Sequence, residues 1–349
     1  MTSTASETWP ENGTEAVLHC PACGGSERRV LYEGLTDRVF GSAPGAWTLK
    51  QCSGCRSAYL DPRPTRDTIG LAYRIYVTHE VEDPDAFARM SPRGRLFQSS
   101  INGYLNARYG CTLPHGAWWG GPLLSLAFPL AENMDCEARH LPRPLTGNNR
   151  LLDFGCGNGK YLDQARQMGW TVTGVDLDPQ AVAAAKSRGL EASTQSLADL
   201  VRAGRQFDYI TACHVIEHLF DPADMLAECF KLLRPGGRLW IDTPNIEALG
   251  HHRYGQNWLH LDPPRHLTIF SPPSLENLIR TAGFHKLQRK NRSLYIIYTY
   301  PESRQLASLN RIEPATKRIR FDSEVLTDGF KEYLNPDLRE ALTVVCERP

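Results

Sequence analysis

An excess of one charge is absent from this chain of 349 residues, which carries 39 Lys and Arg side chains and 39 Asp and Glu side chains. Without a net field, the protein does not attract nucleic acid or an anionic membrane through overall charge. The sequence also lacks the run of ~20 apolar residues that a membrane-spanning helix needs. Residues 1–12 are polar and lack the basic and apolar regions of a secretory signal. We therefore expect a cytoplasmic protein without a membrane span, and nucleic acid is not its expected partner.

A glycine is also absent where a dinucleotide-binding turn would need one. Residues 151–159 read Leu-Leu-Asp-Phe-Gly-Cys-Gly-Asn-Gly, and Lys160 occupies the place of the last glycine in the fingerprint G-x-G-x-x-G. The apolar residues 150–154 predict a buried strand before the turn, and 160–168 have helical spacing after it. Asp176 ends the next predicted strand, where a carboxylate can accept both hydroxyls of a ribose. The pattern predicts a βαβ unit for a nucleoside-like cofactor other than a dinucleotide.

Four motifs in this order, spread over about 90 residues, resemble those of the class I S-adenosylmethionine-dependent methyltransferases. They are the glycine turn, Asp176, the strand 207–210 leading into 216–219, and the segment 232–239. The resemblance implies S-adenosylmethionine (SAM) as cofactor and an α/β fold with a Rossmann-like sheet of seven strands. In that fold the last strand, here 341–346, inserts antiparallel between its neighbours. The β-branched and aromatic run 294–300 predicts a further strand.

The resemblance also implies which residues surround the cofactor. They are Asp153, Gly155, Cys156, Gly157, Gly159, Asp176, Leu177, Gln195, Ser196, His214 and His218. Many relatives carry an acidic residue after the third strand, which bonds the adenine amino group. This chain has Gln195 and Ser196 there, and Asp199 is the nearest carboxylate. The adenine contacts are thus the part of the implied site where the chain departs from the family's pattern.

Four of the ten cysteines form two C-x-x-C pairs separated by 28 residues: Cys20, Cys23, Cys52 and Cys55. Each pair can present two thiolates on one tight turn, and two pairs complete a closed tetrahedral site of the structural type. Zinc is the expected metal, and because such a site has no open coordination position, it organises structure and does not activate water. Strand-like runs at 29–32 and 47–51 suit a small ribbon that depends on the metal. The alternative is a redox pair beside a chance pair.

The chain divides into four predicted segments. They are a tail (1–15), a zinc-ribbon-like module (16–65), a helical connector (66–147) and a class I methyltransferase domain (148–349). Within the connector, 95–109 has helical spacing. Two interpretations of residues 95–130 stay open. They form a cap over the substrate, as the resemblance implies, or a linker that packs on the zinc module.

A cluster of metal-capable side chains follows the fourth predicted strand. If a helix begins near His214, then His214, Glu217 and His218 share one face. The block resembles quinone-pathway O-methyltransferases and small-RNA terminal 2′-O-methyltransferases, in which a Glu-x-x-Glu-His motif carries a divalent metal. His214 stands where that motif has its first Glu. We favour a metal-free lining of the cofactor pocket, with a second divalent metal at these three residues as the alternative.

Four of the eleven histidines fall between residues 250 and 266, after the fifth predicted strand and therefore at the edge where α/β sheets bind ligands. A hydroxyl that accepts a methyl group must lose its proton, and histidine, with an ordinary pKa of ~6.5, is suited to take it. His266 follows a double proline and resembles the Pro-Arg-His-Leu turn of related bacterial methyltransferases, so we predict it as the base. Its alternative role is to hydrogen-bond the loop to the core. His214 and Asp262 are reserve candidates.

The sequence therefore predicts a SAM-dependent enzyme that O-methylates a small molecule such as a sugar, a lipid-linked glycan or a secondary metabolite. Three alternatives stay open. One is C-methylation of a nucleotide-linked deoxysugar, since enzymes of that kind also join a cysteine-rich zinc module to this fold. The second is an RNA methyltransferase, against which the nearly neutral first 70 residues count. The third is a degenerate binding module, which the intact glycine turn and Asp176 make the weakest of the three.

Overall fold

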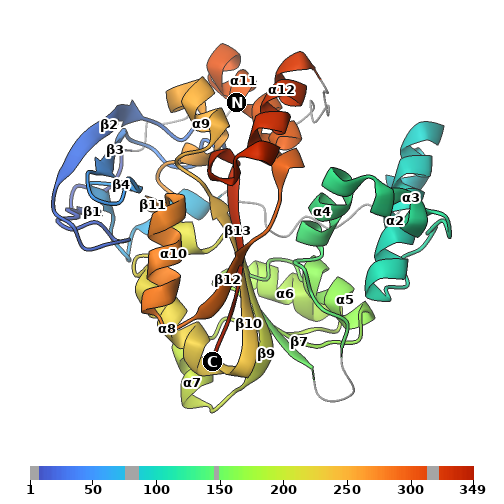
Figure 1. The fold of residues 1–349 in the computed structure, drawn as a ribbon. Helices are drawn as coiled ribbons and strands as arrows, with labels where there is room; N and C mark the ends of the chain where they lie inside the picture. The colour runs from blue at the N-terminus through green and yellow to red at the C-terminus, as the bar shows by residue number, and fades with distance from the viewer. Residues whose placement is uncertain (1–7, 75–85, 145–148, 313–321) are drawn as a thin grey trace, which may run out of the picture.

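The computed structural model describes residues 8–74, 86–144, 149–312 and 322–349 (Figure 1). Its centre is a mixed sheet of seven strands in the order β12-β13-β10-β9-β6-β7-β8. The strands of this sheet are β6 (Arg150–Phe154), β7 (Thr171–Val175), β8 (Glu191–Ser193), β9 (Phe207–Cys213), β10 (Leu233–Pro244), β12 (His285–Arg289) and β13 (Ala341–Glu347). The prediction of a Rossmann-like sheet of seven strands is confirmed. The last strand, β13, lies between β12 and β10 and is antiparallel to both, as predicted.

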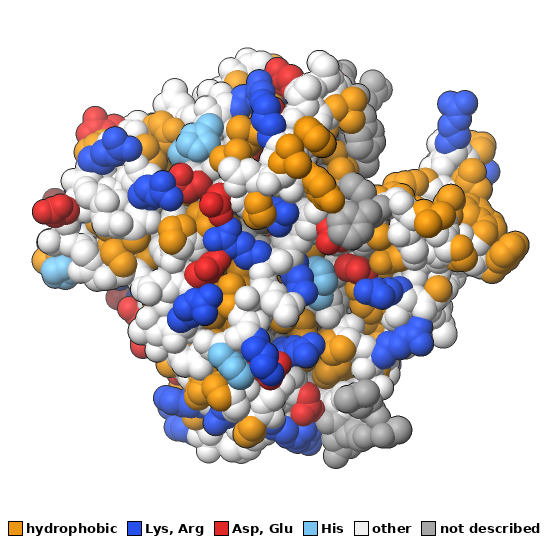
Figure 2. All heavy atoms as spheres, viewed as in Figure 1, with side chains coloured by type: hydrophobic (Ala, Val, Ile, Leu, Met, Phe, Trp, Pro, Cys, Tyr) orange, Lys and Arg blue, Asp and Glu red, His pale blue; other side chains and the backbone are white. Residues whose placement is uncertain are grey.

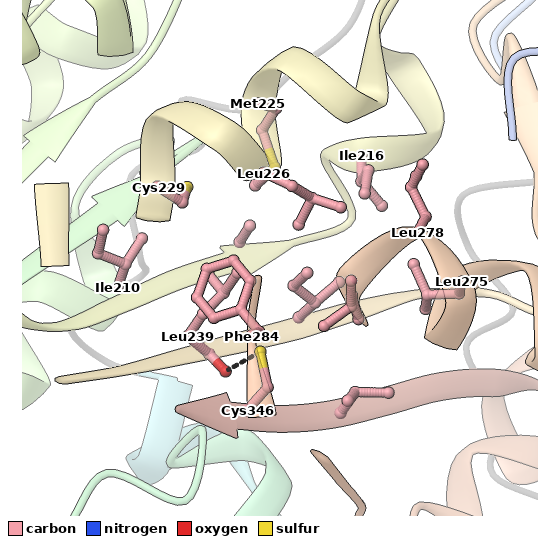
Figure 3. Packing of buried hydrophobic residues seen from close by; sticks show 14 of the residues in the cluster. Ile210, Ile216, Met225, Leu226, Cys229, Leu239, Leu275, Leu278, Phe284 and Cys346 are labelled. Carbon is pink, nitrogen blue, oxygen red and sulfur yellow. Dashed lines mark hydrogen bonds between the residues drawn. The ribbon is translucent and has the colours of Figure 1, made fainter. Parts of the chain in front are cut away.

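Helices cover both faces of the sheet (Figure 1). They are α5 (Lys160–Gln167), α6 (Pro179–Ser187), α7 (Leu197–Arg202), α8 (Pro222–Leu232) and α10 (Pro272–Thr281). Sequence signals start several of these helices: Ser271 caps α10 with Pro272 next to it, and Asp178 caps α6 with Pro179 next to it. Figure 3 shows one face of the sheet, where Leu226 of α8 and Leu275 of α10 point toward Ile210 and Leu239 on the strands. Burial of these apolar side chains holds the layers together.

A second sheet joins the N-terminal module to the rest of the chain. Its strands, in spatial order, are β11 (Thr268–Ile269), β4 (Ala58–Leu60), β3 (Trp47–Cys52) and β2 (Arg28–Leu35). A separate pair is formed by β1 (Thr14–Glu15) and β5 (Arg63–Pro64). Because β11 begins two residues after His266, the loop that contains the predicted base runs directly into a sheet of the N-terminal module.

The part of the helical connector formed by residues 92–126 projects from the body of the molecule (Figure 1). The whole connector contains η1 (Ile69–Tyr73), α1 (Ala86–Arg89), α2 (Pro92–Tyr109), α3 (Gly120–Leu126) and α4 (Phe128–Glu137). Ser91 caps α2, and Gly110 ends it in the left-handed conformation. On the face shown in Figure 2, Lys and Arg side chains are interspersed with Asp and Glu over the body of the protein. Among the described residues, no helix is long and apolar enough to cross a membrane.

The prediction of a strand at 294–300 is wrong. This run forms η5 (Ser293–Tyr295) and the start of α11 (Ile296–Leu309), and β12 takes the sheet position instead. Ile296, Ile297 and Tyr300 are buried at helical spacing against α12 (Ser323–Leu334), so tertiary packing overrides the strand preference of the side chains. The remaining short helices are η2 (Ile216–His218), α9 (Leu249–Tyr254), η3 (Gly255–Asn257), η4 (Leu259–Leu261) and η7 (Pro336–Leu338).

Candidate active site

The glycine turn connects β6 to α5 and needs glycine for two reasons. Gly155, Gly157 and Gly159 have φ of 75°, 52° and 78°, in the left-handed region that favours glycine. A Cβ on Gly155 would also lie 2.5 Å from Cγ2 of Val215, and one on Gly159 would lie 2.7 Å from Cδ1 of Leu190. The turn can therefore pack tightly against the neighbouring chain and leave its backbone open to a ligand.

Asp176 directly follows β7 and faces this turn. Its Oδ2 accepts a hydrogen bond of 2.8 Å from the N–H of Gly157, and its Oδ1 accepts one of 2.9 Å from the N–H of Asp178. The side chain of Asp176 is partly exposed, and Leu177 beside it is exposed. Because each carboxylate oxygen has a second lone pair, Asp176 can accept ribose hydroxyls while it holds the turn.

Asp153 lies on the other side of the turn and is fully buried. Its Oδ1 accepts hydrogen bonds from Thr211 Oγ1 (2.8 Å) and from Arg139, whose guanidinium lies 3.7 Å from the ring centre of Tyr161. Burial raises the pKa of Asp153, although Arg139 opposes this change. Its Oδ2 is buried and has no hydrogen-bond partner among the described residues. A buried carboxylate oxygen without a partner is unusual and needs an explanation.

The other implied cofactor residues lie near the same edge. Cys156 is buried, and its Sγ lies close enough to Gly174 that a Cβ there would be 2.7 Å from it. Gln195 is exposed, and Ser196 is the N-cap of α7. Asp199 accepts hydrogen bonds from both the N–H and the hydroxyl of Ser196 in a capping box. The Asp199 carboxylate is therefore already used in capping α7.

His214 does not start a helix, because β9 runs to Cys213 and the next helical turn, η2, begins at Ile216. His214 itself has φ of 52°, an uncommon left-handed backbone for a residue other than glycine. The predicted shared helix face of His214, Glu217 and His218 is therefore wrong. The turn instead brings His214 Nδ1 to 3.2 Å from Glu217 Oε1.

Glu217 is fully buried and holds His214 in one orientation. Its Oε2 accepts a hydrogen bond of 2.8 Å from Thr243 Oγ1. Burial acts to raise the pKa of Glu217, but the hydrogen bond with His214 and the nearby His218 outweigh it and lower the pKa to about 2. An ionised Glu217 accepts the Nδ1–H of His214, so the lone pair of the neutral imidazole lies on Nε2.

The Nε2 side of His214 faces two further groups. The hydroxyl of Tyr295 lies 3.2 Å from Nε2, and Asp242 Oδ2 lies 3.4 Å from it. Asp242 is buried, and it accepts hydrogen bonds from Arg292 and from Thr343. The side chain of His214 is 27% exposed, so a ligand can reach its ring.

His218 and His266 form a pair of neighbouring imidazoles close to Glu217. Nδ1 of His218 donates to the backbone oxygen of Arg265 (2.9 Å), and Nδ1 of His266 donates to that of His260 (2.7 Å). The two rings meet edge to face with centroids 4.8 Å apart. Burial, together with His266, lowers the pKa of His218 to about 4. In both residues a backbone carbonyl thus occupies Nδ1, which leaves Nε2 for other contacts.

Three groups of potential metal ligands occur among the described residues. Glu217 and His218 meet His266, whereas His214 meets Cys213 and Asp242, and in each group the ligand atoms lie within 4.8 Å of one another. The set of His214, Glu217 and His218 considered from the sequence is therefore split between two clusters. The third group is Cys20, Cys23, Cys52 and Cys55, with 3.6 Å between the sulfurs of Cys20 and Cys55 and between those of Cys23 and Cys52.

Asp262 has a different environment from the histidines. Its carboxylate accepts two hydrogen bonds from Arg265, from Nε to Oδ2 (2.9 Å) and from Nη2 to Oδ1 (2.6 Å). His266 Nε2 is 4.0 Å from the same carboxylate. Asp262 is thus committed to an ion pair, and its use as a catalytic group stays a prediction.

The sequence did not single out Arg139, Asp37 or Tyr295. Arg139 follows α4 with φ of 50°, in a segment read only as a connector. Asp37 lies in the ribbon, and Tyr295 in the run interpreted as a strand. None of them belongs to a local motif, because each reaches the site through contacts between distant parts of the chain.

A seven-stranded sheet with an antiparallel last strand, and a glycine turn and a carboxylate after neighbouring parallel strands, is the arrangement of an α/β protein that binds a nucleoside-like cofactor. The chain belongs to the SAM-dependent methyltransferase family, and the family model described as a methyltransferase domain matches residues 130–289. Among curated relatives, the ubiquinone biosynthesis O-methyltransferase of Xylella fastidiosa is 31% identical over 183 residues, which cover 48% of this chain and 73% of that protein.

Two further proteins are similar to this chain, one in sequence and one in fold. The enzyme of the same name from Xanthomonas oryzae pv. oryzae is 38% identical over 103 residues, which cover 28% of this chain. The match spans 43% of the length of that relative. The solved structure of a SAM-dependent methyltransferase from Archaeoglobus fulgidus is 17% identical to this chain, with a TM-score of 0.40. The match covers 58% of this chain and 86% of that chain. The N-terminal module lies outside the residues matched by the family model.

Proposed function

We propose that the protein O-methylates a small-molecule acceptor and that His214 is the general base. The observation that supports this role is the pairing of His214 Nδ1 with the buried Glu217, while the His214 side chain is 27% exposed. A carboxylate in this position fixes the tautomer and stabilises the imidazolium that forms when Nε2 takes a proton. Asp242, 3.4 Å from Nε2, adds a second negative charge that favours the imidazolium.

His214 suits this role better than His266, which the sequence favoured. The side chain of His266 is 8% exposed, compared with 27% for His214. His266 also has a backbone carbonyl as its Nδ1 partner, which orients the ring but adds no full negative charge. We therefore propose that His266 and His218 hold Glu217 and the loop of residues 260–266 in place.

The residues around the glycine turn suit SAM. When bound, SAM supplies a methyl group that its sulfonium charge activates for in-line transfer. Asp176 would accept the ribose hydroxyls, and the partnerless oxygen of Asp153 would accept the ammonium group. Arg139 holds Asp153 in place through its guanidinium.

Asp176→Asn is expected to weaken binding of S-adenosylhomocysteine (SAH) by at least about tenfold. The amide keeps the shape of the side chain but lacks the charge that strengthens its hydrogen bonds to hydroxyls. Calorimetric titration of the full chain with SAH measures the change. Asp178→Asn is the matched control, because Asp178 caps α6 two residues away and asparagine also caps helices well. Equal affinities of wild type and Asp176→Asn would contradict the assignment.

We further propose that Cys20, Cys23, Cys52 and Cys55 bind one structural zinc ion. Four thiolates at ~2.3 Å from a tetrahedral zinc lie about 3.8 Å from one another. The two sulfur separations of 3.6 Å, from Cys20 to Cys55 and from Cys23 to Cys52, agree with this value. Cys52 is buried in a hydrophobic cluster that also contains Phe270 and Leu275, so the metal would organise the contact between the ribbon and α10.

Metal analysis of the purified protein is expected to find about one zinc ion per chain. Cys52→Ser is expected to lose most of this zinc and to unfold at a lower temperature, because the metal replaces a core that the ribbon is too small to form. Cys111→Ser is the control, since Cys111 is buried but lies outside the cluster. The zinc assignment fails if Cys52→Ser retains its metal or if both variants lose it equally.

The acceptor is identified by its product. We expect transfer of a labelled methyl group from SAM to a hydroxyl of a small molecule, with phenols, sugars and nucleotide sugars as the acceptors to compare. Mass spectrometry and NMR of the product distinguish a methyl ether from a methyl group on carbon, which would favour the deoxysugar C-methyltransferase. Salt-sensitive binding and methylation of RNA would instead support the nucleic-acid alternative.

A further inference from the structure

Arg265 is a fully buried cation that directly precedes His266 in the chain. Two carboxylates from distant parts of the chain form ion pairs with it. Asp262 belongs to the same loop, and Asp37 comes from the N-terminal module, with hydrogen bonds of 2.9 Å to Nη1 and 2.5 Å to Nη2 of Arg265. Nη1 also donates to the backbone oxygen of Ala72 (2.9 Å). Neutralising Asp37 would leave Arg265 paired with Asp262 but would weaken its charge-assisted hydrogen bonds to the N-terminal module, so the contact with Asp37 bears on the position of Arg265.

Arg265 stands at the junction of both buried imidazoles. Its backbone oxygen accepts the Nδ1–H of His218, and His266 is the next residue. The oxygen of Asp262 that pairs with Arg265 Nε is also the one 4.0 Å from His266 Nε2. A shift of Arg265 would therefore change the orientation of His218 and His266 together. One ring nitrogen of each histidine lies within 4.8 Å of a carboxylate oxygen of Glu217.

The position of Asp37 is itself built into the ribbon. Its oxygens accept hydrogen bonds from the backbone N–H groups of Phe40 (3.1 Å), Ser42 (2.9 Å) and Ala43 (3.0 Å). Burial acts to raise the pKa of Asp37, but Arg265 and these amides lower it to about 2, so the carboxylate is ionised. The loop that follows β2 is thus folded around a single charge that faces Arg265.

We propose that Asp37 is a positioning residue of the acceptor site, through which the N-terminal module holds Arg265 and thereby orients His218 and His266. This inference rests on the proposed function, because it takes these histidines to line the acceptor side of the active site. It gives the module a part in the reaction even though the module lies outside the matched methyltransferase domain. In addition, the hydroxyl oxygen of Tyr73, in the connector, lies 3.0 Å from Nδ1 of His218 and helps to hold the His218 ring in place.

The effect of Asp37 can be separated from docking of the module. The pairing of β4 with β11 and the hydrogen bond between Ser57 and Ser274 (2.6 Å) also attach the module, and neither involves Asp37. A matched carboxylate is available in Asp61, which is buried in the same module and accepts hydrogen bonds from Lys50 and from the N–H of Val17. Among the described residues, the Asp61 carboxylate pairs with Arg28, Lys50 and the N–H of Val17, and not with Arg265.

The test compares Asp37→Asn and Asp61→Asn in the full chain. We expect Asp37→Asn to lower kcat about tenfold with an acceptor that the wild type methylates, and to leave the affinity for SAH within about twofold. In protein labelled with ¹⁵N-histidine, the imidazole nitrogen signals of His218 and His266 are expected to shift in Asp37→Asn and to stay unchanged in Asp61→Asn. These signals report ring tautomer and hydrogen bonding and need no turnover.

Two results would overturn the proposal. One is an Asp37→Asn variant with the kcat and the histidine signals of the wild type. The other is an equal effect of Asp61→Asn on both, which would make the role of Asp37 merely structural. If no acceptor is methylated by the wild type, the proposed function fails, while the histidine signals still decide whether Asp37 orients the two rings.

Discussion

His214→Gln is expected to lower kcat by about 10²–10⁴-fold, which is the usual contribution of a general base. Glutamine keeps a polar side chain of similar length but cannot take a proton from the acceptor at neutral pH. The affinity for SAH is expected to stay within about twofold, because the groups proposed to hold the cofactor are Asp176 and Asp153 and not His214, which the resemblance also placed around the cofactor. Initial rates with the identified acceptor, together with calorimetric titration of SAH, measure both quantities.

Glu217→Gln is the companion variant for this prediction. It removes the negative charge that accepts the Nδ1–H of His214, so we expect a large loss of kcat as well. His252→Gln serves as the control, because His252 is an exposed histidine on α9. The assignment of His214 would be wrong if His214→Gln stayed active while His266→Asn lost activity, and His266 would then be the base that the sequence predicts.

The parts of the fold that the sequence predicts well are those coded by neighbouring residues. The glycine turn, the strand before it and Asp176 follow from spacing over 26 residues, 151–176, and the structure places Asp176 against the turn through Gly157. The two C-x-x-C pairs likewise converge because each pair lies on one tight turn. Local patterns of this kind carry their own geometry, so a single sequence is enough to interpret them.

The parts that it predicts poorly depend on contacts between distant residues. Arg265 lies 228 positions from Asp37, and no spacing rule connects a ribbon loop to a turn that follows two prolines. Tyr295 reaches His214 only because its segment is helical, and that helix is stabilised by packing of Ile296 and Tyr300 against α12. The composition of that run favours a strand, and tertiary burial decides otherwise.

The backbone at His214 shows the same limit on a smaller scale. A helix that started there would place His214, Glu217 and His218 on one face, and this expectation follows correctly from helical geometry. The left-handed conformation of His214 breaks that regularity and directs its ring toward Glu217 and Tyr295. Such strained conformations persist where the surrounding structure imposes them, which is common at functional sites.

Acid is expected to destabilise the protein well above the pH at which carboxylates protonate, because some histidines are buried in the neutral form. His251 donates from Nδ1 to the backbone oxygen of Ile246 and lies 3.0 Å from the hydroxyl of Tyr32 through Nε2. Burial lowers the pKa of His251 to about 4, and burial also lowers that of His140 to about 4. In the unfolded chain, both would titrate near ~6.5.

The sign of the effect follows from proton uptake. Below pH ~6.5 the unfolded chain binds protons that folded His140 and His251 do not, so the free energy of unfolding falls with pH until it passes about 4. Each histidine accounts for a loss of about 2 kcal/mol between pH 7.5 and 5, which urea unfolding at the two pH values measures. His251→Gln is expected to reduce this loss by about 2 kcal/mol, whereas His252→Gln, at the exposed neighbouring position, is expected to leave it unchanged. If His251→Gln loses as much stability between the two pH values as the wild type and His252→Gln do, then the buried, neutral state of His251 does not contribute to the loss of stability in acid.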